Sequence, residues 1–148
     1  MRVKWTAILV AAVADWVLGA VWFYAFAKQW SAGLRAASEP IPAGMTHPNF
    51  WPFLIALVSS IVMAYVIARV VAGSQTRGLF RGIIAGILVG LAAAMAMVTE
   101  MVFEIHPGSF VLIAAGYPLV GCILMGITIG AWRVKAAPVV TRPAPTKP

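Results

Sequence analysis

Apolar residues follow this chain in four long blocks separated by short polar stretches. The blocks are Trp5–Phe26, Trp51–Val71, Leu79–Phe103 and Phe110–Trp132. Each reaches the length of about 20 residues that a helix needs to cross a hydrocarbon core of about 30 Å. The strands of an outer-membrane barrel would instead alternate apolar and polar residues over about 10 positions. The pattern therefore predicts an all-α fold, a four-helix transmembrane bundle.

Glycine recurs at every fourth position of the third block. The row consists of Gly78, Gly82, Gly86 and Gly90, and Ala94 extends it. An interior glycine costs a helix in water about 1 kcal/mol relative to alanine, but in lipid this spacing makes a groove into which another backbone packs closely. Gly126 and Gly130 form a second pair of this kind, and Gly19 is a small residue in the first block. These glycines predict close helix packing, either within the bundle or between copies of the chain, so the pattern allows a homo-oligomer.

Composition supports lipid as the solvent of this protein. Hydrophobic residues make up 62% of the 148 residues and charged residues only 10%, whereas soluble domains carry about 25% charged residues. The net charge of +7 comes from basic residues at the ends of the apolar blocks, and they do not form the basic face of a nucleic-acid-binding module. The expected partner is the lipid bilayer, with no nucleic acid.

Lysine and arginine placement predicts the orientation. They are concentrated before the first block, between the second and third, and after the fourth, so the positive-inside rule puts both termini in the cytoplasm. The N-terminus resembles a secretory signal, but the long apolar run with Asp15 inside it favours a retained helix over a cleaved one.

The chain divides into a transmembrane domain and a tail. Residues 1–135 hold the four blocks, and residues 136–148 form a proline-rich basic segment that we expect to be disordered and cytoplasmic. The longest connection, residues 27–49, contains several glycines and prolines, with room for a short interfacial helix around Gln29–Ala37.

Asp15 is the residue most indicative of chemistry. An acid at the centre of a membrane helix costs about 2.5–3.5 kcal/mol on insertion scales and is by default a functional candidate. It shares a helical face with Ala11 and Gly19, so we expect it to face the bundle. No lysine or arginine lies at its depth, and burial without a counter-charge favours the protonated acid.

Depth along the helices suggests partners for Asp15. Ser59 and Ser60 lie about 12–14 Å from Trp51, and Tyr117 about 11 Å from Phe110, at 1.5 Å per residue. Pro118 removes one helix hydrogen bond and frees the carbonyl of Ala114. The predicted intramembrane polar site thus comprises Asp15, Ser59, Ser60, Tyr117 and a freed carbonyl. It is either a proton or cation site or a set of hydrogen bonds that only joins helices.

A second polar group lies at the other ends of the helices. Glu100, Glu104, His106 and His47 are residue types that bind divalent metals, but the spacing matches no metal motif and reads more simply as a helix end and a turn. We therefore expect no metal, no cofactor and no catalytic residue, and a chain that is not an enzyme.

Several aromatic and glycine patterns, taken in order, resemble a known family. They are Leu18-Gly19-Ala20, Trp22-Phe23-Tyr24, Lys28-Gln29-Trp30, Met63-Ala64-Tyr65, Phe103-Glu104 with Pro107, Ala115-Gly116-Tyr117, and Met125-Gly126 with Gly130 and Trp132. The chain resembles the bacterial membrane proteins grouped as domain of unknown function 1761. The resemblance implies a four-helix integral membrane protein and supplies no activity. We expect the chain to lie in the bacterial cytoplasmic membrane. Asp15 is not part of the family pattern, and Pro118 stands where another residue is usual.

Several functions are compatible with these features. The first is a non-enzymatic multi-pass membrane protein whose role lies in packing or assembly through its glycine faces. The alternative is a small proton- or cation-coupled transporter that uses Asp15. A pore along the axis of a symmetric oligomer is a third possibility.

Overall fold

Over the part of the chain that the structure describes, the fold consists of four long helices and one short helix. The computed structural model describes residues 4–36, 50–73 and 78–132. Its helices are α1 (Trp5–Ala25), α2 (Ala27–Ala36), α4 (Trp51–Gly73), α5 (Leu79–Phe103) and α6 (Gly108–Ala131). All but α2 are long and apolar enough to cross a membrane. The prediction of four apolar helices is confirmed. The predicted tail, residues 136–148, lies outside the described residues.

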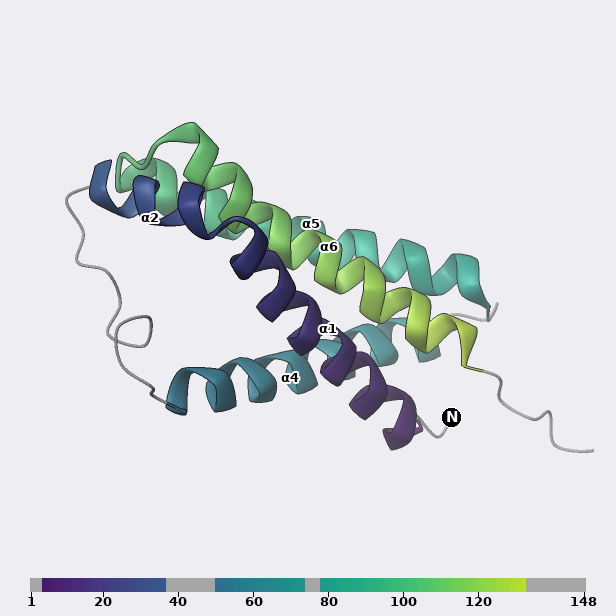
Figure 1. Ribbon diagram of the computed structural model, residues 1–148. Helices are drawn as coiled ribbons and strands as arrows, with labels where there is room; N and C mark the ends of the chain where they lie inside the picture. The colour runs from purple at the N-terminus through teal and green to yellow at the C-terminus, as the bar shows by residue number, and fades with distance from the viewer. Residues whose placement is uncertain (1–3, 37–49, 74–77, 133–148) are drawn as a thin grey trace, which may run out of the picture.

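The four long helices run alternately up and down. α5 and α6 lie side by side as a hairpin, and α1 crosses in front of α4 and α6 (Figure 1). The starts of α1 and α5 and the ends of α4 and α6 gather at one end of the bundle (Figure 1). For α5 and α6 this follows from the short connection between Phe103 and Gly108, because consecutive helices joined by a short turn pack as antiparallel neighbours.

Helix α2 begins directly after α1 and folds against the start of α6. Its buried residues are Gly33 and Leu34, while Lys28 and Arg35 are exposed. A Cβ atom on Gly33 would collide with the ring of Phe110, so the absent side chain is what allows this contact. The short helix expected around Gln29–Ala37 thus begins at Ala27, and Ala37 lies outside the described residues.

The contact between α5 and α6 is made by backbone atoms. A Cβ on Gly82 would overlap the carbonyl oxygen of Gly126 and lie 2.8 Å from the Cα of Gly130. A Cβ on Gly86 would overlap the carbonyl oxygen of Cys122, and one on Gly90 would lie 3.0 Å from the Cα of Leu119. The glycine rows of the two helices therefore face one another within a single chain.

Gly78 has a different role from the rest of its row. It precedes α5 as the N-cap residue with φ of +138°, a conformation that favours glycine. A Cβ at this position would meet nothing within 4 Å. Glycine is needed here by the backbone conformation at the helix start.

Alanines form much of the core together with a few larger side chains, and many large apolar side chains face outward. The core is composed of Ile8, Ala11, Ala12, Ala64, Ile67, Ala68, Ala85, Cys122 and Met125. By contrast, large apolar residues such as Val58, Phe80 and Leu88 are at least half exposed. In water such a surface would drive aggregation, whereas in a bilayer it contacts lipid chains. The fold is that of a multi-pass membrane protein.

Replacing Gly86 by Leu is expected to separate α5 from α6, since the new side chain has no space beside the carbonyl of Cys122. Overpacking of this kind costs about 1–3 kcal/mol, which SDS-induced unfolding of the purified protein in mild detergent would measure. Ala92→Leu, on an exposed position of the same helix, is the matched control and should change stability little. Equal effects of the two substitutions would contradict the packing described here.

Candidate intramembrane polar site

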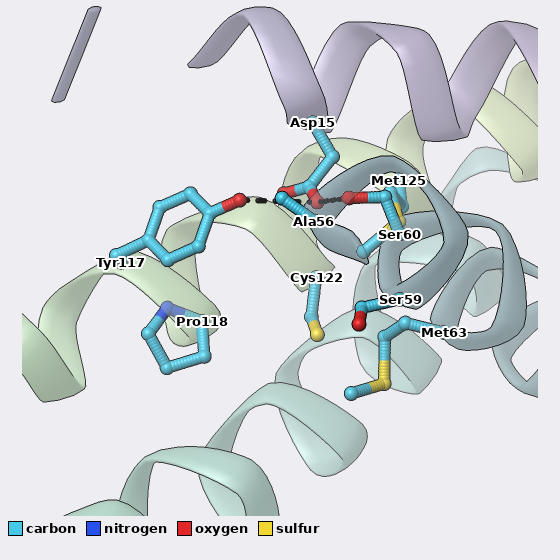
Figure 2. A pocket seen from close by; sticks show the side chains of 9 residues that line it. All are labelled: Asp15, Ala56, Ser59, Ser60, Met63, Tyr117, Pro118, Cys122 and Met125. Carbon is cyan, nitrogen blue, oxygen red and sulfur yellow. Dashed lines mark hydrogen bonds between the residues drawn. The ribbon is translucent and has the colours of Figure 1, made fainter. Parts of the chain in front are cut away.

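Three long helices meet at the Asp15 carboxyl group. Asp15 is only 5% exposed, and Ser60 of α4 donates a hydrogen bond of 2.6 Å from its hydroxyl to Asp15 Oδ2. The Tyr117 hydroxyl of α6 donates to the same oxygen at 3.3 Å. Figure 2 shows the two hydroxyl groups approaching the carboxyl from opposite sides. The two hydrogen bonds connect α1 to α4 and to α6 near the middle of each helix.

Two glycines make room for this group. A Cβ on Gly19 would lie 2.9 Å from the Tyr117 hydroxyl oxygen, and a Cβ on Gly121 would collide with Asp15 Oδ1. Gly121 is not among the site residues expected from the sequence. Its signal was its position four residues after Tyr117, which places both on one face of α6. Whether that face meets Asp15 depends on how α1 crosses α6, which the sequence does not specify.

Ser59 takes a position at the edge of the site. It is exposed and lines the adjacent cavity, whereas its neighbour Ser60 is buried and bonded to Asp15. Successive residues of a helix point about 100° apart, because a turn contains 3.6 residues. The carboxyl group therefore has Ser60 as its partner on α4.

A cavity of about 160 Å³ adjoins the carboxyl group between α4 and α6. Its lining residues are Asp15, Ala56, Ser59, Ser60, Met63, Tyr117, Pro118, Cys122 and Met125 (Figure 2). Asp15 is the one acidic residue among them, and more than half are apolar. The lining of this cavity thus combines a carboxyl group with largely hydrophobic walls.

Aromatic side chains cover the site toward α2. The Phe23 ring lies 5.5 Å from that of Tyr117 and 5.0 Å from that of Trp30, measured between centroids. Trp22 donates from its indole nitrogen to the carbonyl oxygen of Ile113 at 3.0 Å. The α6 carbonyl that accepts this side-chain hydrogen bond is that of Ile113. The carbonyl that Pro118 was expected to free belongs to the next residue, Ala114.

The sequence suggested a second polar group of glutamates and histidines at the other ends of the helices, and the structure brings Glu104 and His106 of this group together. His106 Nε2 lies 3.0 Å from Glu104 Oε2, with the histidine side chain 3% and the glutamate side chain 53% exposed. Glu100 is exposed near the end of α5, and His47 lies outside the described residues. Over residues 4–36, 50–73 and 78–132, no three His, Cys, Asp or Glu residues lie close enough to hold a metal ion.

The charge environment of Asp15 is set by hydroxyl groups. Among the residues that the structure describes, its hydrogen-bond partners are Ser60 and Tyr117, and it forms no ion pair with a basic residue. Both donors meet Oδ2. A proton carried by this carboxyl therefore belongs on Oδ1, on the side of Gly121. Such a group can hold one proton or one cation in an apolar setting.

A protein-family model described as "protein of unknown function (DUF1761)" matches residues 6–130. The chain belongs to the DUF1761 family. Comparison with curated proteins and with solved structures gives no match. The resemblance drawn from the sequence patterns is thereby confirmed, and this DUF1761 protein is a multi-pass membrane protein whose family carries no assigned activity. Asp15, Ser60 and Tyr117 all lie within the matched residues.

The two hydroxyl partners of Asp15 are expected to contribute unequally to the stability of this DUF1761 protein. Ser60→Ala removes the 2.6 Å bond and Tyr117→Phe the 3.3 Å bond. Hydrogen bonds between membrane helices contribute about 0.6 kcal/mol on average, with a maximum of about 1.7, and Ser60→Ala should reach the upper part of this range. SDS-induced unfolding measures the loss of stability in both variants. A larger loss of stability for Tyr117→Phe than for Ser60→Ala would contradict the prediction.

Gly121→Ala is expected to displace the Asp15 carboxyl and to lower stability by about 1–3 kcal/mol, the usual effect of overpacking. In an Asp15→Ala background the added methyl group no longer meets Oδ1, so most of the loss should disappear. Gly108→Ala, where a Cβ would meet nothing within 4 Å, serves as the control on the same helix. An equal loss in both backgrounds would show that the methyl group clashes with something other than Asp15.

Proposed function

We propose that this DUF1761 protein is a small carrier that exchanges protons for cations at Asp15. The observation that carries the proposal is a buried carboxyl group, held by Ser60 and Tyr117, on the wall of a cavity near the middle of the membrane-spanning helices. An acid at that depth is unfavourable in lipid, and acids there commonly mark ion or proton pathways.

The exchange requires no enzymatic step. A protonated Asp15 that binds a cation releases its proton, and the carboxylate then neutralises the bound charge. When the cation leaves, the carboxylate takes up a proton again. One carboxyl group that carries either a proton or a cation gives an electroneutral exchange, and Ser60 and Tyr117 solvate the carboxylate by donating to it in place of water.

The other candidate role, assembly of copies through glycine faces, has less support. Gly82 and Gly86 of α5 already pack on Gly126 and Cys122 of α6 within one chain. These faces are therefore not available to a second copy. We propose that the glycine rows hold the bundle together and so support the site.

We further propose that the protein lies in the bacterial cytoplasmic membrane with both termini inside. Arg69 near the end of α4 and Arg81 near the start of α5 lie at the same end of the bundle as the start of α1. Lys4, which precedes α1, adds a third basic residue at this end, and an excess of basic residues is typical of the cytoplasmic side.

Purified protein in lipid vesicles with an acidic interior tests the exchange. External Na⁺, K⁺ and benzyltrimethylammonium, which has a permanent charge and cannot cross as a neutral base, are added separately while an internal dye reports pH. With at least one of the three cations, the interior should become alkaline at least about tenfold faster than with Asp15→Asn. Asparagine keeps an oxygen that accepts both hydroxyl bonds, so this variant is expected to fold.

Glu100→Gln, which removes an exposed carboxyl at the end of α5, is the matched control and should behave like the wild type. Identical proton fluxes in the wild type and in Asp15→Asn for all three cations would dispose of the carrier proposal.

A further inference from the structure

We infer that the cavity beside Asp15 binds an organic ammonium ion whose apolar part is about the size of one aromatic ring, and that this ion enters from the bilayer between α4 and α6. The inference rests on the proposed carrier function and names its substrate class. Three features of the cavity carry it: the chemistry of the lining, the volume, and the side on which the cavity opens.

The lining separates a small polar end from a larger apolar wall. The carboxyl of Asp15 and the hydroxyls of Ser60 and Tyr117 lie together at one side (Figure 2). The remaining wall includes Met63 and Met125, whose flexible, polarizable side chains adapt to varied apolar ligands. A ligand that matches both parts has a cationic head and a hydrophobic body.

The same lining is unsuited to calcium or magnesium. Calcium and magnesium take about six or more oxygen ligands from several directions, whereas the side-chain oxygens here belong to the group around Asp15, with Ser59 at the edge. An ammonium group needs only a few acceptors for its N–H donors. The carboxyl supplies the countercharge, and the face of the Tyr117 ring attracts cations as well.

The volume limits the size of the apolar body. A cavity of about 150 Å³ holds one benzene molecule, and the cavity beside Asp15 is about 160 Å³. A single ring or a branched alkyl group of similar size therefore fills it. A larger cation with several rings would extend beyond the cavity on its open side.

The cavity opens on the side of the bundle. Ala56 and Ser59 line it and are exposed, although both lie well inside α4. Met63 continues this edge one turn further along the helix. At that depth the surroundings of the bundle are lipid, in which amphiphilic amines dissolve. Such a ligand reaches the carboxyl without passing through the polar ends of the bundle.

Binding exchanges one charge for another. The protonated carboxyl of Asp15 and the ammonium ion give a carboxylate–ammonium pair and one proton released to water. The predicted signature is thus the release of about one proton per chain on binding, as linkage between proton and ligand binding requires.

Titration of the wild-type protein in mild, weakly buffered detergent tests this signature. The probes are benzylammonium chloride, the neutral analogue benzyl alcohol, NaCl and KCl, with a pH indicator and calorimetry as readouts. Benzylammonium should bind and release protons, and the other three probes should not. Asp15→Asn should abolish the proton release, and Glu100→Gln should preserve it.

A pair of α4 variants tests the route of entry. Ala56→Phe fills the exposed edge of the cavity and should slow the association of benzylammonium, followed by stopped-flow proton release, at least about tenfold. Val58→Phe places the same ring on an exposed position that does not line the cavity and should leave the association rate unchanged. Equal association rates for the two variants would overturn the route between α4 and α6.

The outcomes separate the substrate class from the carrier function. Proton release by Na⁺ or K⁺ that depends on Asp15, with none by benzylammonium, would overturn the organic-ammonium assignment and leave the carrier proposal intact. Proton release by none of the cationic probes would overturn the organic-ammonium assignment, and together with vesicle fluxes that are the same in Asp15→Asn it would overturn the carrier proposal as well.

Discussion

A carboxyl group inside a bilayer must receive its hydrogen bonds from the protein, because lipid chains offer none. Asp15 satisfies this requirement through Ser60 on α4 and Tyr117 on α6. The constraint acts on the whole bundle. It fixes which faces of α4 and α6 turn toward α1, and it requires glycine at position 121, where any side chain would occupy the space of the carboxyl.

The bundle combines two kinds of helix contact. In the α5–α6 hairpin, glycines such as Gly82 and Gly126 bring backbones together over a long stretch, which gains van der Waals contact without polar groups. Around Asp15 the helices are joined by hydrogen bonds and leave a cavity beside them. The bundle thus has a tightly packed hairpin on one side and a looser, polar junction with an adjoining cavity on the other.

The sequence predicted the helices better than the site. Hydropathy alone placed Leu79–Phe103 with the bounds that α5 has in the structure, because lipid imposes one length and one composition on every span. Counting residues from the helix ends predicted that Ser60 and Tyr117 lie at the level of Asp15. It could not separate Ser60 from Ser59, or reveal Gly121 and the cavity, because these depend on helix rotation and crossing, which depth does not specify.

The partners of Asp15 lie far away along the chain. Ser60 follows it by 45 residues and Tyr117 by 102. During synthesis the first helix therefore emerges before either hydroxyl group exists, and its acid group has to be tolerated until the last helix is made. The α5–α6 hairpin, by contrast, needs only its own short turn to close. The order of translation thus leaves the hydrogen bonds of Asp15 incomplete until α6 has been made.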